Sequence, residues 1–226
     1  MADLHAPGAP TPLLTALDDA QRASLLSTGR SVALPAGSSL LFEGDVSGRV
    51  VALVSGFARV FATAQNGREV LLNVVGPGEL LGTVSALDGG PHSASVTALG
   101  EAEVVFIDAT TFRRLLGAEP WLAAAVAAGL ARDLRRVERH RVELSAYDVP
   151  TRLAGRLVDL ADHIADGALP VTLPVSQREL AEWCGASREA VTKALKGFRS
   201  RGWVTTDQGS VTLLDIDALR ARAPQA

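Results

Sequence analysis

The sequence predicts an α+β protein with an N-terminal β-roll, a long dimerisation helix and a C-terminal winged helix-turn-helix. Residues 34–106 alternate short apolar runs with turn signals, which favours many short strands. Residues 121–147 contain no proline and repeat apolar side chains at helical spacing. Residues 171–214 follow the order helix, glycine turn, helix and hairpin. We expect a flexible tail over 1–12, the β-roll over 13–118, the long helix over 119–147 and the winged domain over 148–226.

Composition excludes several classes of protein. The chain of 226 residues has a single cysteine, Cys184, so an internal disulfide, a four-cysteine zinc site and a cysteine-held iron–sulfur cluster are excluded. We expect Cys184 to be a small buried core residue. The net charge of −3 means that any nucleic-acid surface must be local. No apolar run reaches a membrane span, and the N-terminus lacks a signal peptide, which favours a cytoplasmic protein with no membrane partner.

The N-terminal pattern predicts a β-roll of about eight strands. Asn66-Gly67 lies between two β-rich runs and predicts a hairpin. Residues 82–96, "GTVSALDGGPHSASV", have the outline of a loop that closes over a phosphate-bearing ligand. Two positions where such a loop needs charge hold Thr83 and His92 instead. We expect His92 to lie on a solvent-exposed turn.

The segment from Trp121 to Tyr147 predicts one long helix. Leu130, Val137 and Leu144 are spaced by seven residues, as along one seam of a coiled coil. A helix of about 27 residues is about 40 Å long, which is too long for one small domain to cover. We therefore expect a partner helix from a second copy of the chain, the alternative being a helix packed on its own β-roll.

The C-terminal segment predicts a helix-turn-helix. Asp148 is expected to cap a new helix, and we expect the loop "DGALP" that follows this helix to act as a hinge. Ser176 and Glu179 form a capping box, and Gly185 allows a sharp turn before Ser187 caps the second helix. A two-stranded wing is expected from "WVTTDQGSVTLL".

The second of these helices has a basic outer face. The chain's two lysines both lie on it, and its outward residues are Arg188, Glu189, Thr192, Lys193, Lys196 and Arg199. Arginine can donate two hydrogen bonds to guanine, and a carboxylate can accept one from cytosine N4. The alternative interpretation is a solvated charged face. The capping box, the glycine turn, the apolar register and the wing together favour DNA binding.

These motifs resemble those of the cyclic-AMP receptor protein/Fnr family of bacterial transcription regulators. The resemblance runs from about Leu13 to Leu214 and rests on "LFEGD", "NGRE", "GPGELLG", "YDVPTRLAGRLVDLA" and "VSQRELAEWCGASREAVTKAL". It implies a homodimer on near-palindromic double-stranded DNA, with RNA polymerase as a further partner. It places Arg188, Glu189 and Lys193 at the base-reading positions, where lysine replaces a final arginine and should make a looser contact. The remaining DNA-binding candidates are the phosphate-contacting Ser176 and Gln177, with Ser187 and Lys196.

The ligand pocket departs from the family pattern. Gly82, Ser93 and Ala94 are kept, whereas Thr83 replaces the glutamate that holds the ribose and His92 replaces the arginine that neutralises the phosphate. The adenine-contacting Thr-Ser pair of the long helix is replaced by Val137 and Glu138. Losing two charged partners would weaken binding by roughly a hundredfold or more. We therefore expect a degenerate pocket, no cofactor, and weak or absent cyclic-AMP binding, with regulation either ligand-independent or dependent on another small molecule.

Three alternatives remain. One is a cyclic-AMP-dependent regulator of the same family. Another is a cupin-type β-barrel metalloenzyme, but the four histidines, His5, His92, His140 and His163, are scattered, so we expect no catalytic residue and no metal. The third is a cyclic-nucleotide sensor acting on a partner protein, against which the helix-turn-helix argues.

Overall fold

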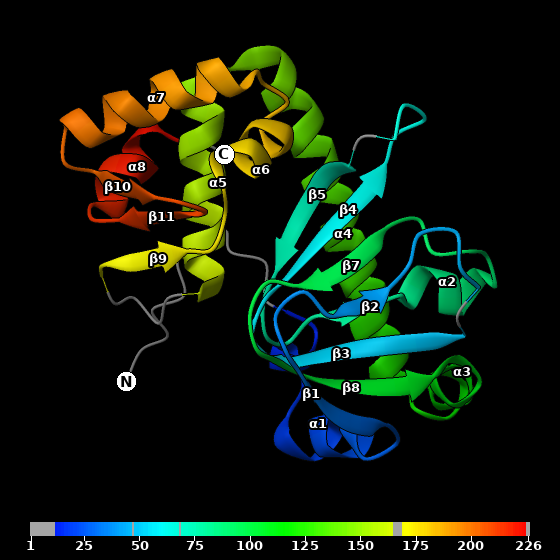
Figure 1. The fold of residues 1–226 in the computed structure, drawn as a ribbon. Helices are drawn as coiled ribbons and strands as arrows, with labels where there is room; N and C mark the ends of the chain where they lie inside the picture. The colour runs from blue at the N-terminus through cyan, green and yellow to red at the C-terminus, as the bar shows by residue number, and fades with distance from the viewer. Residues whose placement is uncertain (1–11, 47, 68, 165–168, 225–226) are drawn as a thin grey trace. The chain divides into compact units, whose positions relative to one another are not determined.

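The computed structural model describes residues 12–46, 48–67, 69–164 and 169–224 (Figure 1). The chain divides into two compact units, one over residues 10–135 and the other made mainly of residues 136–226. The division falls within the long helix. The expected tail over 1–12 lies almost entirely outside the described residues, as does most of the "DGALP" loop.

Two four-stranded antiparallel sheets form the first unit. The first has the order β1 (Arg30–Leu34), β8 (Ala102–Asp108), β3 (Arg49–Ser55) and β6 (Leu80–Leu81). The second has the order β2 (Ser39–Leu41), β7 (Ser95–Ala98), β4 (Ala58–Thr63) and β5 (Glu69–Val75). The turn that joins β4 to β5 contains Asn66-Gly67, and Gly67 has a φ of +77°, so the predicted hairpin is confirmed.

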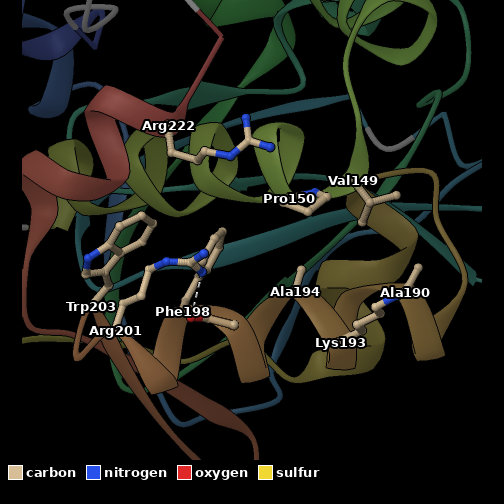
Figure 2. A pocket seen from close by; sticks show the side chains of 10 residues that line it. Val149, Pro150, Ala190, Lys193, Ala194, Phe198, Arg201, Trp203 and Arg222 are labelled. Carbon is tan, nitrogen blue, oxygen red and sulfur yellow. Dashed lines mark hydrogen bonds between the residues drawn. The ribbon is translucent and has the colours of Figure 1, made fainter.

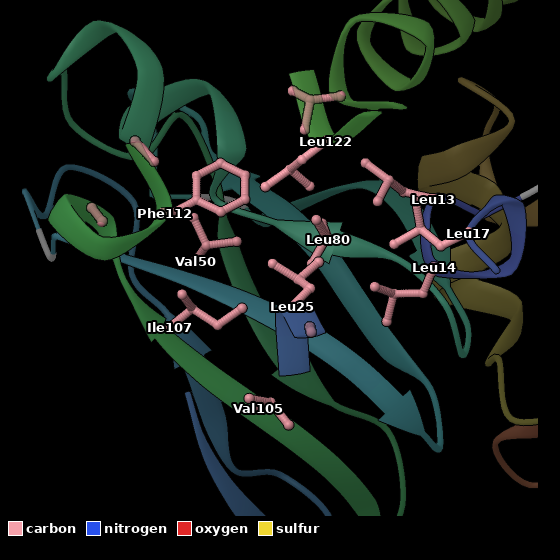
Figure 3. Close-up of a cluster of buried hydrophobic side chains, with 14 residues drawn as sticks. Leu13, Leu14, Leu17, Leu25, Val50, Leu80, Val105, Ile107, Phe112 and Leu122 are labelled. Carbon is pink, nitrogen blue, oxygen red and sulfur yellow. The ribbon is translucent and has the colours of Figure 1, made fainter. Parts of the chain in front are cut away.

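Strand β3 is buried on both faces, which explains its unbroken apolar run. Val51 and Leu53 belong to a cluster with residues from both sheets. Val50 and Ala52 point to the opposite face and join a second cluster with Ile107 of β8 (Figure 3). That cluster also takes residues from η1 (Leu14–Ala16), α1 (Asp19–Leu26), α3 (Ala109–Ala118) and the start of α4 (Pro120–Ala146).

A short helix, α2 (Thr83–Asp88), lies in the segment that we expected to be a loop. Gly82 and Gly89 flank it with φ angles of +78° and +73°, so both adopt the left-handed conformation that glycine tolerates best. Six residues are fewer than two helical turns, and a segment this short cannot show a helical period in its sequence. The prediction of a loop between two strands was therefore wrong here.

Helix α4 extends over 27 residues, close to the predicted range. At its start, the Trp121 indole N–H donates to the Glu119 carboxylate at 2.7 Å. Leu122 and Val126 are its buried residues among those described. Further along, Leu134 and Val137 have exposed fractions of 60% and 54%, so the helix presents apolar side chains that its own chain does not cover.

The second unit combines helices with a small sheet. Its helices are α5 (Val149–Ile164), α6 (Gln177–Trp183), α7 (Arg188–Ser200) and α8 (Ile216–Arg222). Asp148 caps α5 as expected, because its carboxylate accepts from the Thr151 N–H at 2.9 Å. The expected wing is the hairpin β10 (Val204–Asp207) and β11 (Ser210–Leu213), but β9 (Val171–Leu173) adds a third strand beside β11. Strand β9 was too short to be recognised from sequence.

Among the described residues, none of the helices has the length and apolar composition needed to cross a membrane.

Candidate nucleic-acid interface and ligand pocket

The first helix of the helix-turn-helix begins with a complete capping box. The Ser176 hydroxyl accepts from the Glu179 N–H at 3.2 Å, and the Glu179 carboxylate accepts from the Ser176 N–H at 2.8 Å. This exchange satisfies two backbone donors that helix formation leaves free. It holds Ser176 and Gln177, the two predicted phosphate contacts, at the N-terminus of α6.

Gly185 makes the turn between α6 and α7. Its φ of +57° lies in the left-handed region, and a Cβ at this position would lie 2.8 Å from Leu144 Cδ2 of α4. Glycine is therefore required both by backbone conformation and by lack of space. The close approach also places the turn against the last turns of α4.

Helix α7 separates a buried face from a charged one. The Ser187 hydroxyl caps it by accepting from the Ala190 N–H at 3.2 Å. Its buried residues are Val191, Ala194, Leu195 and Phe198, and none of them is among the residues predicted to face outward. All six residues expected on the outer face are exposed: Arg188, Glu189, Thr192, Lys193, Lys196 and Arg199. Four of these six are cationic, so a local basic surface exists on a chain of net charge −3.

Hydrogen bonds connect this face to its neighbours. Thr192 of α7 donates to the Gln177 side-chain oxygen at 3.0 Å, which orients Gln177 at the start of α6. Arg199 donates to the Thr206 hydroxyl of the wing at 3.0 Å. Backbone hydrogen bonding at Glu189, then the Ser187 hydroxyl, lowers the pKa of the Glu189 carboxyl. The face therefore offers an ionised acceptor beside its cationic donors.

Two buried arginines of α5 bind to segments next to the helix-turn-helix, and neither role was predicted from the sequence. Arg152 donates from Nε to the Cys184 carbonyl oxygen at 3.0 Å and from Nη1 to the Tyr147 carbonyl oxygen at 2.6 Å. Arg156 lies one turn further along the helix. Their spacing of four residues places them on one side of α5, but nothing in the sequence identifies backbone carbonyl oxygens as partners.

Arg156 is the buried centre of a charge cluster whose other members are partly exposed. Its Nη2 donates to the Glu143 carboxylate of α4 and contacts His140 Nδ1, while Nη1 donates to Asp159 at 3.2 Å. Its guanidinium also lies 5.8 Å from the centre of the Trp183 ring. Burial, then the positive charges of Arg156, Arg152 and Arg136, lowers the pKa of His140 to about 4. The cluster joins the end of α4 to α5 and α6.

The predicted ligand pocket of the β-roll places Gly82 against His92. A Cβ at Gly82 would lie 3.1 Å from His92 Cε1. The His92 N–H donates to the Asp45 carbonyl oxygen at 3.0 Å, and its own carbonyl oxygen accepts from the Gly44 N–H at 2.9 Å. The exposed fraction of His92 is 4%, so the expectation of a solvent-exposed turn residue was wrong. The two backbone hydrogen bonds to the Gly44-Asp45 turn draw the residue inward.

Burial also changes the protonation of His92. Desolvation is the largest influence and lowers its pKa, the Asp45 charge opposes it, and the Arg49 charge adds to it. The ring is therefore neutral near pH 7. A neutral imidazole supplies neither the charge nor the planar fork with which an arginine binds a phosphate.

The other predicted pocket residues are divided between the two compact units. Thr83 begins α2 directly after Gly82 and is half-buried, while Ser93 is exposed and Ala94 half-buried on the segment after His92. Val137 and Glu138 are exposed on α4 and belong to the other compact unit. Their placement beside this pocket stays a prediction.

The described part of the chain contains no group of three or more His, Cys, Asp or Glu side chains that could hold a metal ion. Cys184 is fully buried at the end of α6, as expected. Burial raises the pKa of its thiol to about 12, so the reactive thiolate is absent at neutral pH.

Each of the two compact units matches a known protein family. Residues 31–119 match the cyclic nucleotide-binding domain, and residues 151–222 match the Crp-like helix-turn-helix domain. The chain is 35% identical over 204 residues to the CRP-like cAMP-activated global transcriptional regulator of Mycobacterium tuberculosis, which covers 89% of this chain and 91% of that protein. It is 32% identical over 185 residues to the cyclic AMP receptor protein of Thermus thermophilus, covering 82% and 84%.

Among solved structures, a CRP-family transcriptional regulator from Thermus thermophilus matches with a TM-score of 0.72 and 28% identity. The match covers 86% of this chain and 97% of that one. The chain therefore belongs to the Crp/Fnr family of bacterial transcription regulators, which bind DNA and are not enzymes.

Proposed function

We propose that this protein regulates transcription as a homodimer on near-palindromic DNA and does not depend on cyclic AMP. The observation that carries the second part is the buried, neutral His92 beside Gly82. Thr83 adds to it, because a hydroxyl cannot replace the charge-assisted hydrogen bond that a carboxylate makes to the ribose. Both groups that would hold the charged and polar parts of cyclic AMP are therefore replaced.

The exposed apolar residues of α4 support the homodimer. Leu134 and Val137 are more than half exposed, and Leu144 is 42% exposed. Leu130, Val137 and Leu144 follow a seven-residue spacing, which suits a partner helix of the same sequence. Packing these residues against a second copy removes apolar surface from water.

The exposed face of α7 supports DNA recognition by the residues proposed from sequence. Arg188 and Glu189 read base edges from the start of α7, and Lys193 adds a point charge one turn later. Ser176, Gln177, Ser187 and Lys196 contact the phosphate backbone. A two-fold dimer then requires two half-sites in a near-palindrome. We place the protein in the cytoplasm, with RNA polymerase as a partner.

A cyclic-AMP-dependent regulator is the second candidate. Its support is the similarity to the Mycobacterium tuberculosis protein, whose name states that it is cAMP-activated. Under the first candidate, the dimer either holds the DNA-ready form without a ligand, which we favour, or responds to a different small molecule. Val137 favours the ligand-independent version, because it places an apolar side chain on the α4 seam.

Calorimetric titration with cyclic AMP and cyclic GMP, paired with DNA binding, tests the proposal. We expect no binding tighter than about 1 mM and no change in DNA affinity. The double variant Thr83→Glu/His92→Arg restores both charged groups and should gain affinity by roughly a hundredfold. Micromolar binding by the wild-type protein, or a DNA affinity that rises about tenfold with cyclic AMP, would establish the second candidate instead.

A further inference from the structure

A second pocket lies in the C-terminal unit, on the flank of α7 (Figure 2). Its volume is about 500 Å³, within the range of about 300–1,000 Å³ that is usual for small-molecule sites. The start of α5, the side of α7, Trp203 and Arg222 of α8 surround it. We call it the flank pocket. All of its lining residues belong to one compact unit, and none of them is a residue of the predicted cyclic-nucleotide pocket.

Apolar side chains form much of the lining of the flank pocket. Trp203 is half-buried, and Phe198, which is 3% exposed, supports it from behind with a ring centre 5.5 Å away at an interplanar angle of 32°. Val149 and Pro150 line the pocket from the start of α5, as Figure 2 shows. A surface of this kind gains free energy when an apolar group displaces water from it.

Positive charge surrounds this apolar lining. Arg222 is already neutralised, because its Nη2 contacts both oxygens of Asp148 at 2.9 and 2.8 Å. Among the described residues, neither Lys193 nor Arg201 forms an ion pair with a carboxylate. Two positive charges without an acidic partner in the described part of the chain therefore border the pocket.

Arg201 is well placed to hold an acidic group. Its Nη1 donates to the Gly197 carbonyl oxygen at 3.0 Å, and its guanidinium carbon lies 5.3 Å from the centre of the Trp203 ring. These contacts keep the guanidinium beside the apolar lining. A guanidinium presents paired N–H groups that match the two oxygens of a carboxylate. Lys193 lies eight residues earlier on α7, so its charge attracts the same ligand from further along the pocket.

We propose that the flank pocket binds a small organic anion with an apolar body and a carboxylate headgroup. The body packs on Trp203 and Pro150, which are both half-buried, and the headgroup contacts Arg201. The ligand also lowers DNA affinity, because it reduces the positive charge around Lys193. This last consequence depends on the proposed role of Lys193 in DNA binding, whereas the binding site itself does not.

Titration calorimetry on the full-length protein tests the site without DNA. The probe is 2-naphthoate, and 2-naphthamide is its neutral counterpart of nearly the same shape. We expect 2-naphthoate to bind with a Kd of roughly 0.1–1 mM, as a ligand of its size allows. We expect 2-naphthamide to bind at least about tenfold more weakly, because it cannot pair with the guanidinium. Equal binding of the two compounds would overturn the proposal.

Substitutions locate the binding. Gly197→Leu fills the pocket, and the nearest atom to a Cβ there is Arg201 Nη1 at 3.4 Å, which is contact rather than a clash, so we expect the variant to fold and to lose 2-naphthoate binding. Arg201→Gln should weaken binding about tenfold even if Gly197→Leu does not fold. Lys193→Gln should weaken it more than Lys196→Gln, which removes the same charge from α7 outside the pocket. Unchanged binding in folded Gly197→Leu or in Arg201→Gln would contradict the site.

A DNA-binding assay tests the coupling separately. Saturating 2-naphthoate should weaken DNA binding of the wild-type protein several-fold and leave Gly197→Leu unaffected. Binding of 2-naphthoate with no change in DNA affinity would disprove the coupling. Absence of DNA binding under all conditions would instead contradict the proposed function, while the calorimetry would still decide the site.

Discussion

Arg152 donates from Nε to the Cys184 carbonyl oxygen, which connects the buried side of α5 to the last residue before the helix-turn-helix turn. The same guanidinium also bonds the Tyr147 carbonyl oxygen just after α4. The Arg152 side chain thus connects the backbone just after α4 to the backbone at the end of α6. Its exposed fraction is 9%, so water cannot readily replace it as a donor.

Arg152→Met should destabilise the fold by about 1–3 kcal/mol, because it leaves buried carbonyl oxygens without their donor. DNA affinity should fall with it, since the turn before α7 loses its anchor. Denaturant unfolding and a DNA-binding assay measure the two effects. Arg139→Met is the control, since Arg139 is exposed in the same compact unit and its substitution should change stability by less than about 0.5 kcal/mol. Equal effects of the two substitutions would remove this role from Arg152.

His140 should make stability depend on pH. Its pKa in the folded protein is about 4, below the usual 6.5, so the unfolded chain binds more protons between these values. Stability from this group is fully present above about pH 6.5 and declines as pH falls toward 4. His140→Gln should reduce the loss between about pH 7 and pH 4.5 by about 1–2 kcal/mol, after allowance for the partial exposure of the ring. An identical pH dependence of unfolding free energy in the wild-type protein and in His140→Gln would contradict this role of His140.

Val137→Lys should disrupt the proposed dimer. Val142→Lys is a matched control on the same helix, since Val137 and Val142 are 54% and 62% exposed but Val142 lies off the seven-residue seam. A lysine at Val137 would bring like charges together in the interface, whereas one at Val142 would stay in water. Sedimentation equilibrium should detect monomer in the first variant only. Dimers of unchanged stability in Val137→Lys would place the interface elsewhere.

Arg188→Ala should relax base preference at one position of each half-site and cost about 1–3 kcal/mol of binding free energy. Lys196→Gln should instead weaken binding to all sequences similarly. It should also reduce the number of counterions released on DNA binding by about one. Selection of DNA from a random pool, followed by affinity measurements at several salt concentrations, separates the two. Unchanged sequence preference in Arg188→Ala would exclude it from base reading.

Local sequence signals predicted much of the C-terminal unit. Ser176 with Glu179, and Ser187 before α7, act on backbone groups within three residues, so their roles are visible in short stretches. The β4–β5 turn at Asn66-Gly67 was predictable for the same reason.

Features that depend on distant contacts were not predictable. His92 was expected at the surface and is buried, because the Gly44-Asp45 turn, far away in the sequence, pairs with its backbone. Arg156 has Glu143 and His140 as partners from another helix, and no local pattern indicates such a cluster. Caps and helical period thus made the candidate DNA-binding face predictable from the sequence. The buried contacts of Arg152 and Arg156 on α5 were not predictable.

The tryptophans are distributed between the two units. Trp121 lies at the start of α4 in the first unit, while Trp183 and Trp203 lie in the second, beside Arg156 and Phe198. These are all the tryptophans of the chain. A variant that keeps only Trp121 would report optically on the β-roll, and one that lacks only Trp121 would report on the winged domain. The molecule therefore carries a separate fluorescent probe for each half, with no label attached.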